Sequence, residues 1–146
     1  MRPFLVSLVL PLFLVTVACK EYSTGLQHSS TRADETSAIA TLRTLAQAQT
    51  TYSISNAGHF ANFEQLAEGG FLDSRFHHAS PELHGYVFTL TVNPASDTTP
   101  SSYVCNADPA PASPQGGRHF YIDSDSLDIR MNPTKPATSK DEILRP

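Results

Sequence analysis

The chain has 146 residues, of which 40% are hydrophobic and 16% are charged, and its formal net charge is −4. That length predicts one domain with a modest core. The charged fraction is low against about a quarter in typical domains, and the remaining residues are mostly Ser, Thr, Asn, Ala and Pro, a mix that suits β-strands joined by polar loops. The Lys and Arg residues are scattered, whereas nucleic-acid binding needs a basic patch, so we expect no nucleic-acid partner.

The N-terminus has the pattern of an export signal. Arg2 supplies a positive start, and residues 4–18 are apolar apart from Ser7 and Thr16, with Pro11 in the middle. An apolar stretch this short suits a cleaved signal peptide better than a membrane-spanning helix, which needs roughly 20 apolar residues. We therefore expect residues 1–18 to be a signal peptide.

The expected cleavage point resembles a bacterial lipobox, Thr16-Val17-Ala18-Cys19. Lipidation of Cys19 would hold the mature protein on a membrane of the cell envelope, since an acyl chain gains about 0.8 kcal/mol per buried methylene. The pattern is imperfect because Thr16 stands where Leu is usual. The alternative is an ordinary signal peptide and a secreted protein.

The sequence holds two cysteines, Cys19 and Cys105. If Cys19 is lipidated, Cys105 has no intramolecular partner, and its strand-like neighbours predict a small, buried thiol. If Cys19 is not lipidated, a Cys19–Cys105 disulfide is the alternative in an oxidising compartment.

Two helices are predicted behind a polar segment. Residues 19–33 are rich in Ser, Thr and other polar residues and predict a flexible tether. From about Asp34 to Ser53, apolar residues recur at spacings of three and four, which indicates a helix with one buried face. A short helix over 63–68 has Asn62 as its N-cap and Gly69-Gly70 as its stop.

Four strand-like runs follow, separated by turns rich in Pro, Gly, Ser and Asp. They cover 85–92, 102–107, 118–122 and 127–131, and consecutive strands predict an antiparallel meander with the long helix on one face. The expected fold is therefore α+β over 34–132: a long N-terminal helix on an antiparallel sheet of about four strands. The tail, 133–146, is expected to be irregular.

A series of short motifs gives the mature chain a distinctive order. They are Ala38–Leu45, Gln47–Tyr52, Phe63–Leu66, Gly70–Asp73, Gly85–Phe88, Asn106–Pro109, Gly117–Asp123 and Ile129-Arg130. This order resembles the globular head of bacterial type IV pilin-like and type II secretion pseudopilin-like proteins, over roughly 38–138. The resemblance implies a pilin-head-like fold and protein partners in a pilus or secretion system of the cell envelope. The sequence has no Gly-x-Ser-x-Gly and no His-Glu-x-x-His motif, so we expect neither enzymatic activity nor a cofactor.

The N-terminus departs from the pattern of that family. Members that polymerise keep a long apolar helix behind a Gly–Phe cleavage point, with a Glu a few residues into the helix. Here no Gly precedes a Phe ahead of the apolar run, and no acidic residue lies near its start. The sequence thus predicts a pilin-like head behind a lipoprotein-like signal, which disfavours assembly into a filament.

Two sets of side chains are weak candidates for metal binding: His77, His78 and His84 for zinc, and Asp123, Asp125 and Asp128 for calcium. Adjacent histidines on an extended chain point in opposite directions. The acidic run lacks the central Gly and the distal Glu of an EF-hand loop. A polar surface loop and a hairpin turn are therefore the simpler interpretations, and we expect no metal.

Asp108 and Arg118 flank the segment most typical of the resemblance. We expect Asp108 to cap this loop and Arg118 to pair with it, as loop architecture first and as a partner-binding surface second. Cys105 and His119 could be drawn as a nucleophile and a base, but a thiol within a strand is expected to be inert. The alternative to a structural role is a binding module that uses loop 75–84 or 94–101 to hold a ligand, metal or surface polymer.

Overall fold

The computed structural model describes residues 15–111 and 117–145, with side chains from residue 29 onward. A long helix, α1 (Val15–Ser55), is followed by α2 (Phe63–Glu68) and a single 3-10 turn, η1 (Ser74–Phe76). Six strands complete the chain: β1 (Glu82–Leu83), β2 (Tyr86–Asn93), β3 (Ser102–Pro109), β4 (His119–Asp123), β5 (Arg130–Asn132) and β6 (Glu142–Ile143).

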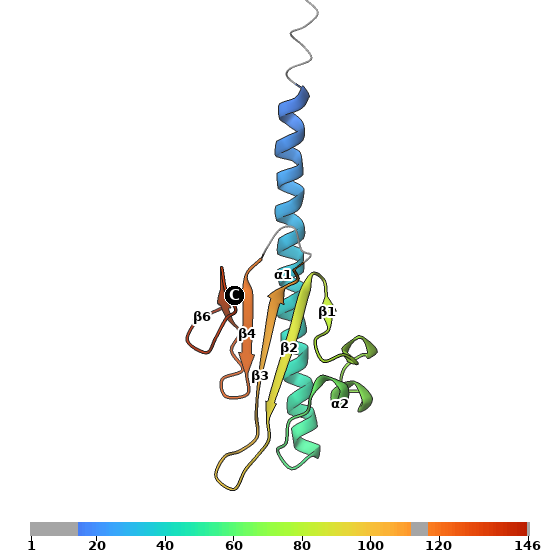
Figure 1. The fold of residues 1–146 in the computed structure, drawn as a ribbon, viewed down its shortest axis with the longest axis vertical. Helices are drawn as coiled ribbons and strands as arrows, with labels where there is room; N and C mark the ends of the chain where they lie inside the picture. Colours follow the sequence, from blue (N-terminus) through green and yellow to red (C-terminus); the bar gives the residue numbers. More distant parts are fainter. Residues whose placement is uncertain (1–14, 112–116, 146) are drawn as a thin grey trace, which may run out of the picture.

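The strands form one antiparallel sheet in which spatial order follows chain order, from β1 to β6. The lower half of α1 covers one face of this sheet (Figure 1). The predicted α+β fold, with a long helix on an antiparallel meander, is confirmed. The sheet has six strands rather than about four because β1 and β6 are two-residue edge strands, which are too short to leave an alternating pattern in the sequence.

The face of α1 that packs on the sheet carries Ala38, Leu42, Leu45 and Gln49, which are buried at spacings of three and four as the sequence predicts. These side chains share one core with residues from three strands: Tyr86, Phe88, Tyr103, Cys105, Ala107, Phe120 and Ile122. Full burial of one large apolar side chain contributes about 1.5–3 kcal/mol, so this contact between helix and sheet contributes substantially to the domain's stability.

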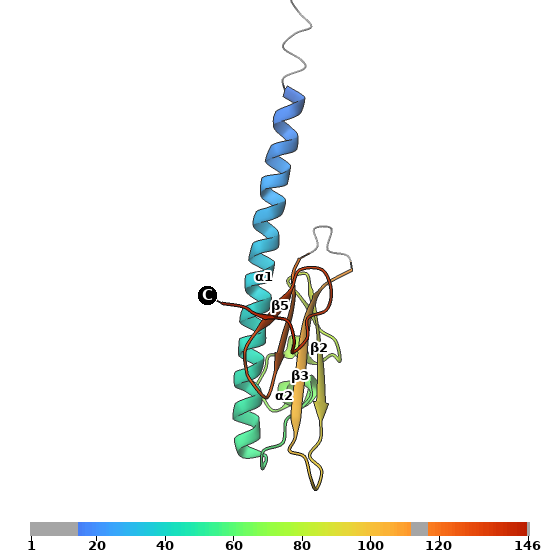
Figure 2. The ribbon, with the colours of Figure 1, turned by 90° about the vertical axis from the view of Figure 1, so that its left-hand side faces the viewer.

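The helix is longer than predicted. It begins at Val15 rather than near Asp34, so segment 19–33, expected to be a flexible tether, is helical and projects beyond the sheet (Figures 1 and 2). No proline interrupts the helix and Gly25 is its one glycine, at a cost of roughly 1 kcal/mol relative to Ala. Its hydroxyl side chains also bond within the helix. That of Thr36, for example, donates to the carbonyl oxygen four residues earlier at 2.8 Å.

Most of the expected signal peptide, residues 1–14, lies outside the described residues. The structure describes Cys19 only as part of the α1 backbone, without its side chain. Across residues 15–111 and 117–145, no helix combines the length and the apolar character needed to cross a membrane.

The short helix α2 confirms its predicted bounds and caps. The Asn62 side chain accepts a hydrogen bond from the backbone N–H of Gln65 at 2.9 Å, and the Gln65 side chain accepts one from the N–H of Asn62 at 3.0 Å. This reciprocal capping box satisfies two backbone donors that the helix itself leaves unpaired. Gly69 ends the helix, and Gly70 follows with φ +73°.

The chain beyond β4 differs from the prediction in two ways. Leu127 does not start a strand: it has a φ of +57°, is 50% exposed, and closes the turn after Asp123. The strand therefore starts only at β5. The tail expected to be irregular folds back over the sheet and includes β6, where Ile143 pairs with Arg130.

One buried polar side chain fastens the C-terminal end of α1. Gln49 is fully buried, donates to the carbonyl oxygen of Ala61 at 2.6 Å, and accepts from the N–H of the same residue at 3.0 Å. The chain after α1 is thereby held against the helix although it has no regular structure of its own at that point.

Gln49→Ala should lower the free energy of unfolding by roughly 2–4 kcal/mol, because it leaves both backbone groups of Ala61 buried without a partner. Urea denaturation of the two proteins measures the difference. The matched control is Gln47→Ala, an exposed glutamine two residues away on the same helix, where we expect a change within about 0.5 kcal/mol. Equal effects at the two positions would contradict the proposed clamp.

Candidate functional site

An ion pair joins α1 to the start of β4 at the level where the helix leaves the sheet. Glu35 is 8% exposed, and its carboxylate accepts from the Arg118 backbone N–H at 3.0 Å, from Nε at 3.1 Å and from Nη2 at 2.8 Å. Burial acts to raise the pKa of Glu35, but the hydrogen bonds and charge of Arg118 outweigh it, so the pKa lies below its ordinary value. The carboxylate is therefore held ionised against the guanidinium.

The backbone around Arg118 is fixed from the other side by a tyrosine. The Tyr86 hydroxyl donates to the carbonyl oxygen of Arg118 at 2.9 Å, and burial raises the pKa of Tyr86, which keeps the hydroxyl protonated. A Cβ atom on Gly117 would lie 2.5 Å from the Tyr86 oxygen, so a larger residue here would displace the tyrosine hydroxyl from this position. The Arg118 guanidinium also lies 5.6 Å from the centre of the Phe120 ring, a cation–π contact.

The expected pair between Asp108 and Arg118 is wrong. Asp108 contacts His119 instead, with 2.6 Å between its Oδ1 and the histidine Nδ1. The register explains this, because Ala107 lies opposite Phe120 and the next pair along the ladder is Asp108 with His119. Opposed residues share one face of a sheet while Arg118, one position earlier, turns to the other face.

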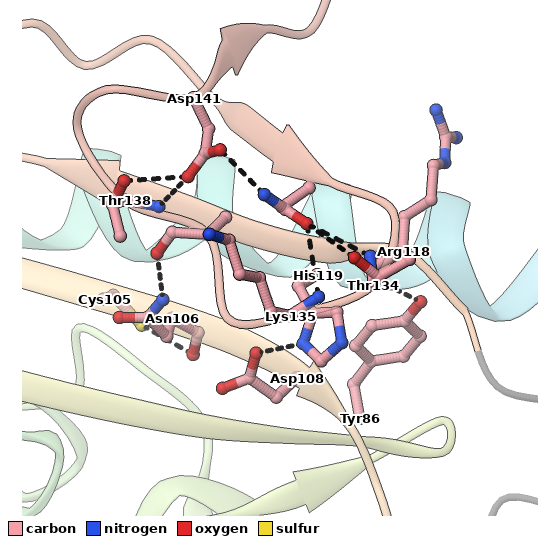
Figure 3. A network of polar contacts seen from close by, with 12 residues as sticks. Tyr86, Cys105, Asn106, Asp108, Arg118, His119, Thr134, Lys135, Thr138 and Asp141 are labelled. Carbon is pink, nitrogen blue, oxygen red and sulfur yellow. Dashed lines mark hydrogen bonds and ion pairs between the residues drawn. The ribbon is translucent and has the colours of Figure 1, made fainter.

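A strap, defined as residues 133–141, lies over the face of the sheet opposite α1 (Figure 3). Asn132 organises its start: its side chain accepts from the N–H groups of Thr134 and Lys135 and donates to Asp141 at 2.7 Å. The other Asp141 oxygen accepts from the N–H and the hydroxyl of Thr138, both at 2.8 Å. The strap is therefore a folded cover and not a loose tail.

The strap is also bonded to the sheet beneath it. The Asn106 side chain on β3 donates to the carbonyl oxygen of Ala137 at 2.8 Å, and Ala137 is itself buried (Figure 3). The guanidinium of Arg130 donates to the carbonyl oxygen of Asp141 at 2.9 Å. These bonds bury the central strand β4 on both faces.

Cys105 is a free thiol with no exposed surface, and burial raises its pKa. This confirms the expected buried thiol and excludes the Cys19–Cys105 disulfide in this structure. His119 does not lie beside it, because Cys105 belongs to the core under α1 while His119 pairs with Asp108 on the opposite face. The two residues do not form a nucleophile and base.

The candidate metal ligands are not brought together. Among the residues that the structure describes, no group of three or more His, Cys, Asp or Glu side chains could hold a metal ion. His77, His78 and His84 are all exposed. Asp125 and Asp128 are exposed as well, whereas Asp123 is buried.

Both carboxylate oxygens of Asp123 accept hydrogen bonds from neighbouring residues of the same turn and strand. Its Oδ1 accepts from the N–H groups of Asp125 and Ser126 and from the Ser126 hydroxyl, and its Oδ2 accepts from Tyr121 at 3.0 Å. Burial acts to raise the pKa of Asp123, but these hydrogen bonds lower it overall, and the pKa of Tyr121 is raised to about 12. The run of acidic residues is a capped hairpin turn, which is the simpler of the two predicted interpretations.

A surface hollow lies beside α1 at the predicted binding loop 75–84. Residues of α1, η1 and β1 line it, among them Thr41, Asp73, Arg75, Phe76 and His84. The charged groups are paired with each other, at 2.7 Å between Arg75 and Asp73, and both are half exposed. The hollow can admit a small polar molecule, although none of its charges is left without a partner.

A comparison of the chain with protein families, with curated proteins and with solved structures found no match. Neither the contacts of Arg118 with Glu35 and Tyr86 nor the folded strap is among the features predicted from the sequence. The signal for the strap was present, because an Asn followed by Pro and Thr is typical of a side-chain-capped turn. The Glu35–Arg118 pair joins residues 83 positions apart, and no local pattern marks such a contact.

Glu35→Gln should destabilise the protein by about 1 kcal/mol at neutral pH, because the charged hydrogen bonds to Arg118 become neutral ones. Since the folded pKa of Glu35 lies below the ordinary value of 4.5, its contribution is complete above that value and is lost as the pH falls through the folded pKa. Urea unfolding at several pH values between 7 and 3 should show the two proteins converging in acid. The control Glu68→Gln changes an exposed glutamate and should have the same free energy of unfolding as the wild type at every pH. A difference between Glu35→Gln and the wild type that stays constant with pH would contradict the ion pair.

Proposed function

We propose that the protein is a non-enzymatic, pilin-like component of the bacterial cell envelope, held at a membrane by its N-terminus. It acts with a type IV pilus or type II secretion system through protein partners. The order of short motifs along the sequence supports this proposal, and so does the arrangement of a long N-terminal helix whose second half packs on an antiparallel sheet.

The observation that carries the proposal is the division of α1 into two parts. The part from Glu35 onward is packed on the sheet, while Ser29 and Ser30 are already exposed and the preceding turns project from the domain (Figure 2). At 1.5 Å per residue, the segment from Cys19 to Asp34 spans roughly 24 Å. A stalk of this length displays a folded head away from the point of attachment.

The absence of a catalytic role is part of the proposal. The one described thiol is buried in the core, on the other face of the sheet from the Asp108–His119 pair. The polar networks instead hold elements together, which suits a head that presents a stable surface.

An exported lipoprotein that binds a ligand, metal or surface polymer is the second candidate. The hollow beside loop 75–84 favours it, because its lining combines hydroxyl, charged and apolar side chains. This candidate predicts a rise in melting temperature when the correct small molecule is added, as expected for any ligand that binds only the folded state.

Photo-crosslinking in the native host tests the partner. A photoreactive residue at Arg43, Gln47 or Thr51, which are exposed on α1, should capture subunits of a pilus or secretion system, identified by mass spectrometry of the adducts. Capture of unrelated envelope proteins alone, or of nothing at any of the three positions, would contradict the assignment to these systems.

The membrane anchor is tested separately through Cys19. In cells fed an alkyne analogue of palmitate, the wild-type protein should incorporate the label and sediment with membranes, whereas Cys19→Ser should lose the label and its lipid-dependent membrane binding. Cys105→Ala is the matched control and should keep both, since that thiol is buried in the core. A native N-terminus that retains the Phe4–Ala18 segment, seen by intact mass spectrometry, would contradict the lipoprotein.

A further inference from the structure

Half of the β2 edge has no partner strand among the described residues. β1 pairs only with Tyr86 and Val87, and the last bond on that side joins the Phe88 N–H to the carbonyl oxygen of Pro81 at 2.9 Å. On its other side, β2 pairs with β3 along its whole length, from Tyr86 to Asn93. The edge beyond Phe88 is therefore the open part of the sheet.

The backbone groups along this open edge point away from β3. In an antiparallel ladder, alternate residues direct both N–H and C=O to the same side. The N–H of Phe88 points toward β1, so the N–H and C=O groups of Leu90 and Val92 also point to that side, away from β3. Those of Thr89 and Thr91 point toward β3. Two donors and two acceptors thus stand in the spacing that a further strand requires.

The strand β2 itself lacks three features by which proteins usually block such pairing. Natural edge strands are protected by charged side chains, proline or bulges. β2 contains no charged residue and no proline, and its register with β3 runs unbroken over eight residue pairs. Neither the sequence of β2 nor its register with β3 therefore blocks the addition of a strand.

A hollow lies beside the open edge, where the chain before Pro81 turns away from β2. It is lined by Leu90 and Phe63, with Asn62, Ala79, His77 and Glu64 around them. Phe63 is buried and makes an apolar floor, while Glu64 is exposed and makes no ion pair with any described residue. The hollow suits one apolar side chain, and its rim suits a positive charge.

From these observations we propose that the β2 edge from Leu90 to Asn93 is a docking site for an extended peptide of a partner protein. The peptide adds a strand to the sheet through the backbone of Leu90 and Val92, a recognition mode known as β-augmentation. It places an apolar side chain in the hollow beside Leu90 and a Lys or Arg near Glu64.

A second copy of this chain does not suit the edge when both copies are anchored. Antiparallel pairing of two β2 edges reverses one copy relative to the other, and β2 runs alongside α1 (Figure 1). The two stalks would then point in opposite directions and could not enter one membrane. This exclusion rests on the proposed anchor, whereas the open edge and the hollow do not.

Hydrogen exchange of the full chain in detergent micelles tests the site. The probe is a synthetic peptide, acetylated and amidated, of alternating Thr and Val flanked by Lys at each end. We expect it to slow deuterium uptake over 88–93 by about fivefold or more, because amide protection reports added hydrogen bonds. The same peptide flanked by Glu should need about tenfold higher concentration, owing to repulsion from Glu64.

Val92→Pro removes one outward N–H without breaking the ladder to β3, since an edge strand tolerates proline where its N–H faces outward. It should abolish protection by the probe, whereas Val92→Ala, which keeps the N–H, should retain it. Equal protection in Val92→Pro, or none in the wild type, would overturn the docking site. Protection that rises with protein concentration without peptide would show that a second copy covers the edge, which overturns the assigned partner. Neither result depends on the lipid-labelling outcome for Cys19.

Discussion

The packing of the second half of α1 on the sheet is the constraint from which the rest of the structure follows. Leu42 and Leu45 are buried against aromatic side chains of β2, β3 and β4, and this is the domain's main apolar contact. Polar side chains fasten it at both ends, with Glu35 bonded to Arg118 at one end and Gln49 bonded to Ala61 at the other. Because a buried polar group without a partner is costly, these bonds determine the angle and height at which the helix lies on the sheet.

The opposite face of the sheet is covered over β3 and β4 by a different means. It carries Asn106 and Tyr121, which a solvent-exposed strand could leave to water, and the strap covers both. The strap has little apolar surface, and its order comes from side-chain bonds of Asn132 and Asp141 to neighbouring backbone groups. The helix α1 therefore lies on one face of the sheet, and the strap covers the other face over β3 and β4.

The sequence predicted the elements that have a strong local pattern and missed those that depend on contacts. The stripe of Leu42, Leu45 and Gln49, the Asn62 cap and the long strands were all visible as periodicity or turn chemistry. The helical state of 19–33 does not follow from composition, because a polar segment is typical of a flexible tether as well, although no proline prevents a helix there. The pairing of Asp108 with His119 depends on the register between β3 and β4. The strap depends on a contact with β3, which lies far away in the chain, so no local sequence pattern predicts either feature.

The open edge of β2 also has a mechanical consequence for an anchored head. β2 runs alongside α1, so in the proposed membrane-anchored arrangement a strand added to this edge would lie along the direction of a pull on the stalk (Figure 1). The hydrogen bonds of an antiparallel pair are perpendicular to the strands, and a pull along the strands loads all of them together rather than one after another. A head that holds its partner in this geometry resists separation better than one that is peeled from its end, even when the paired segment is as short as Leu90 to Asn93.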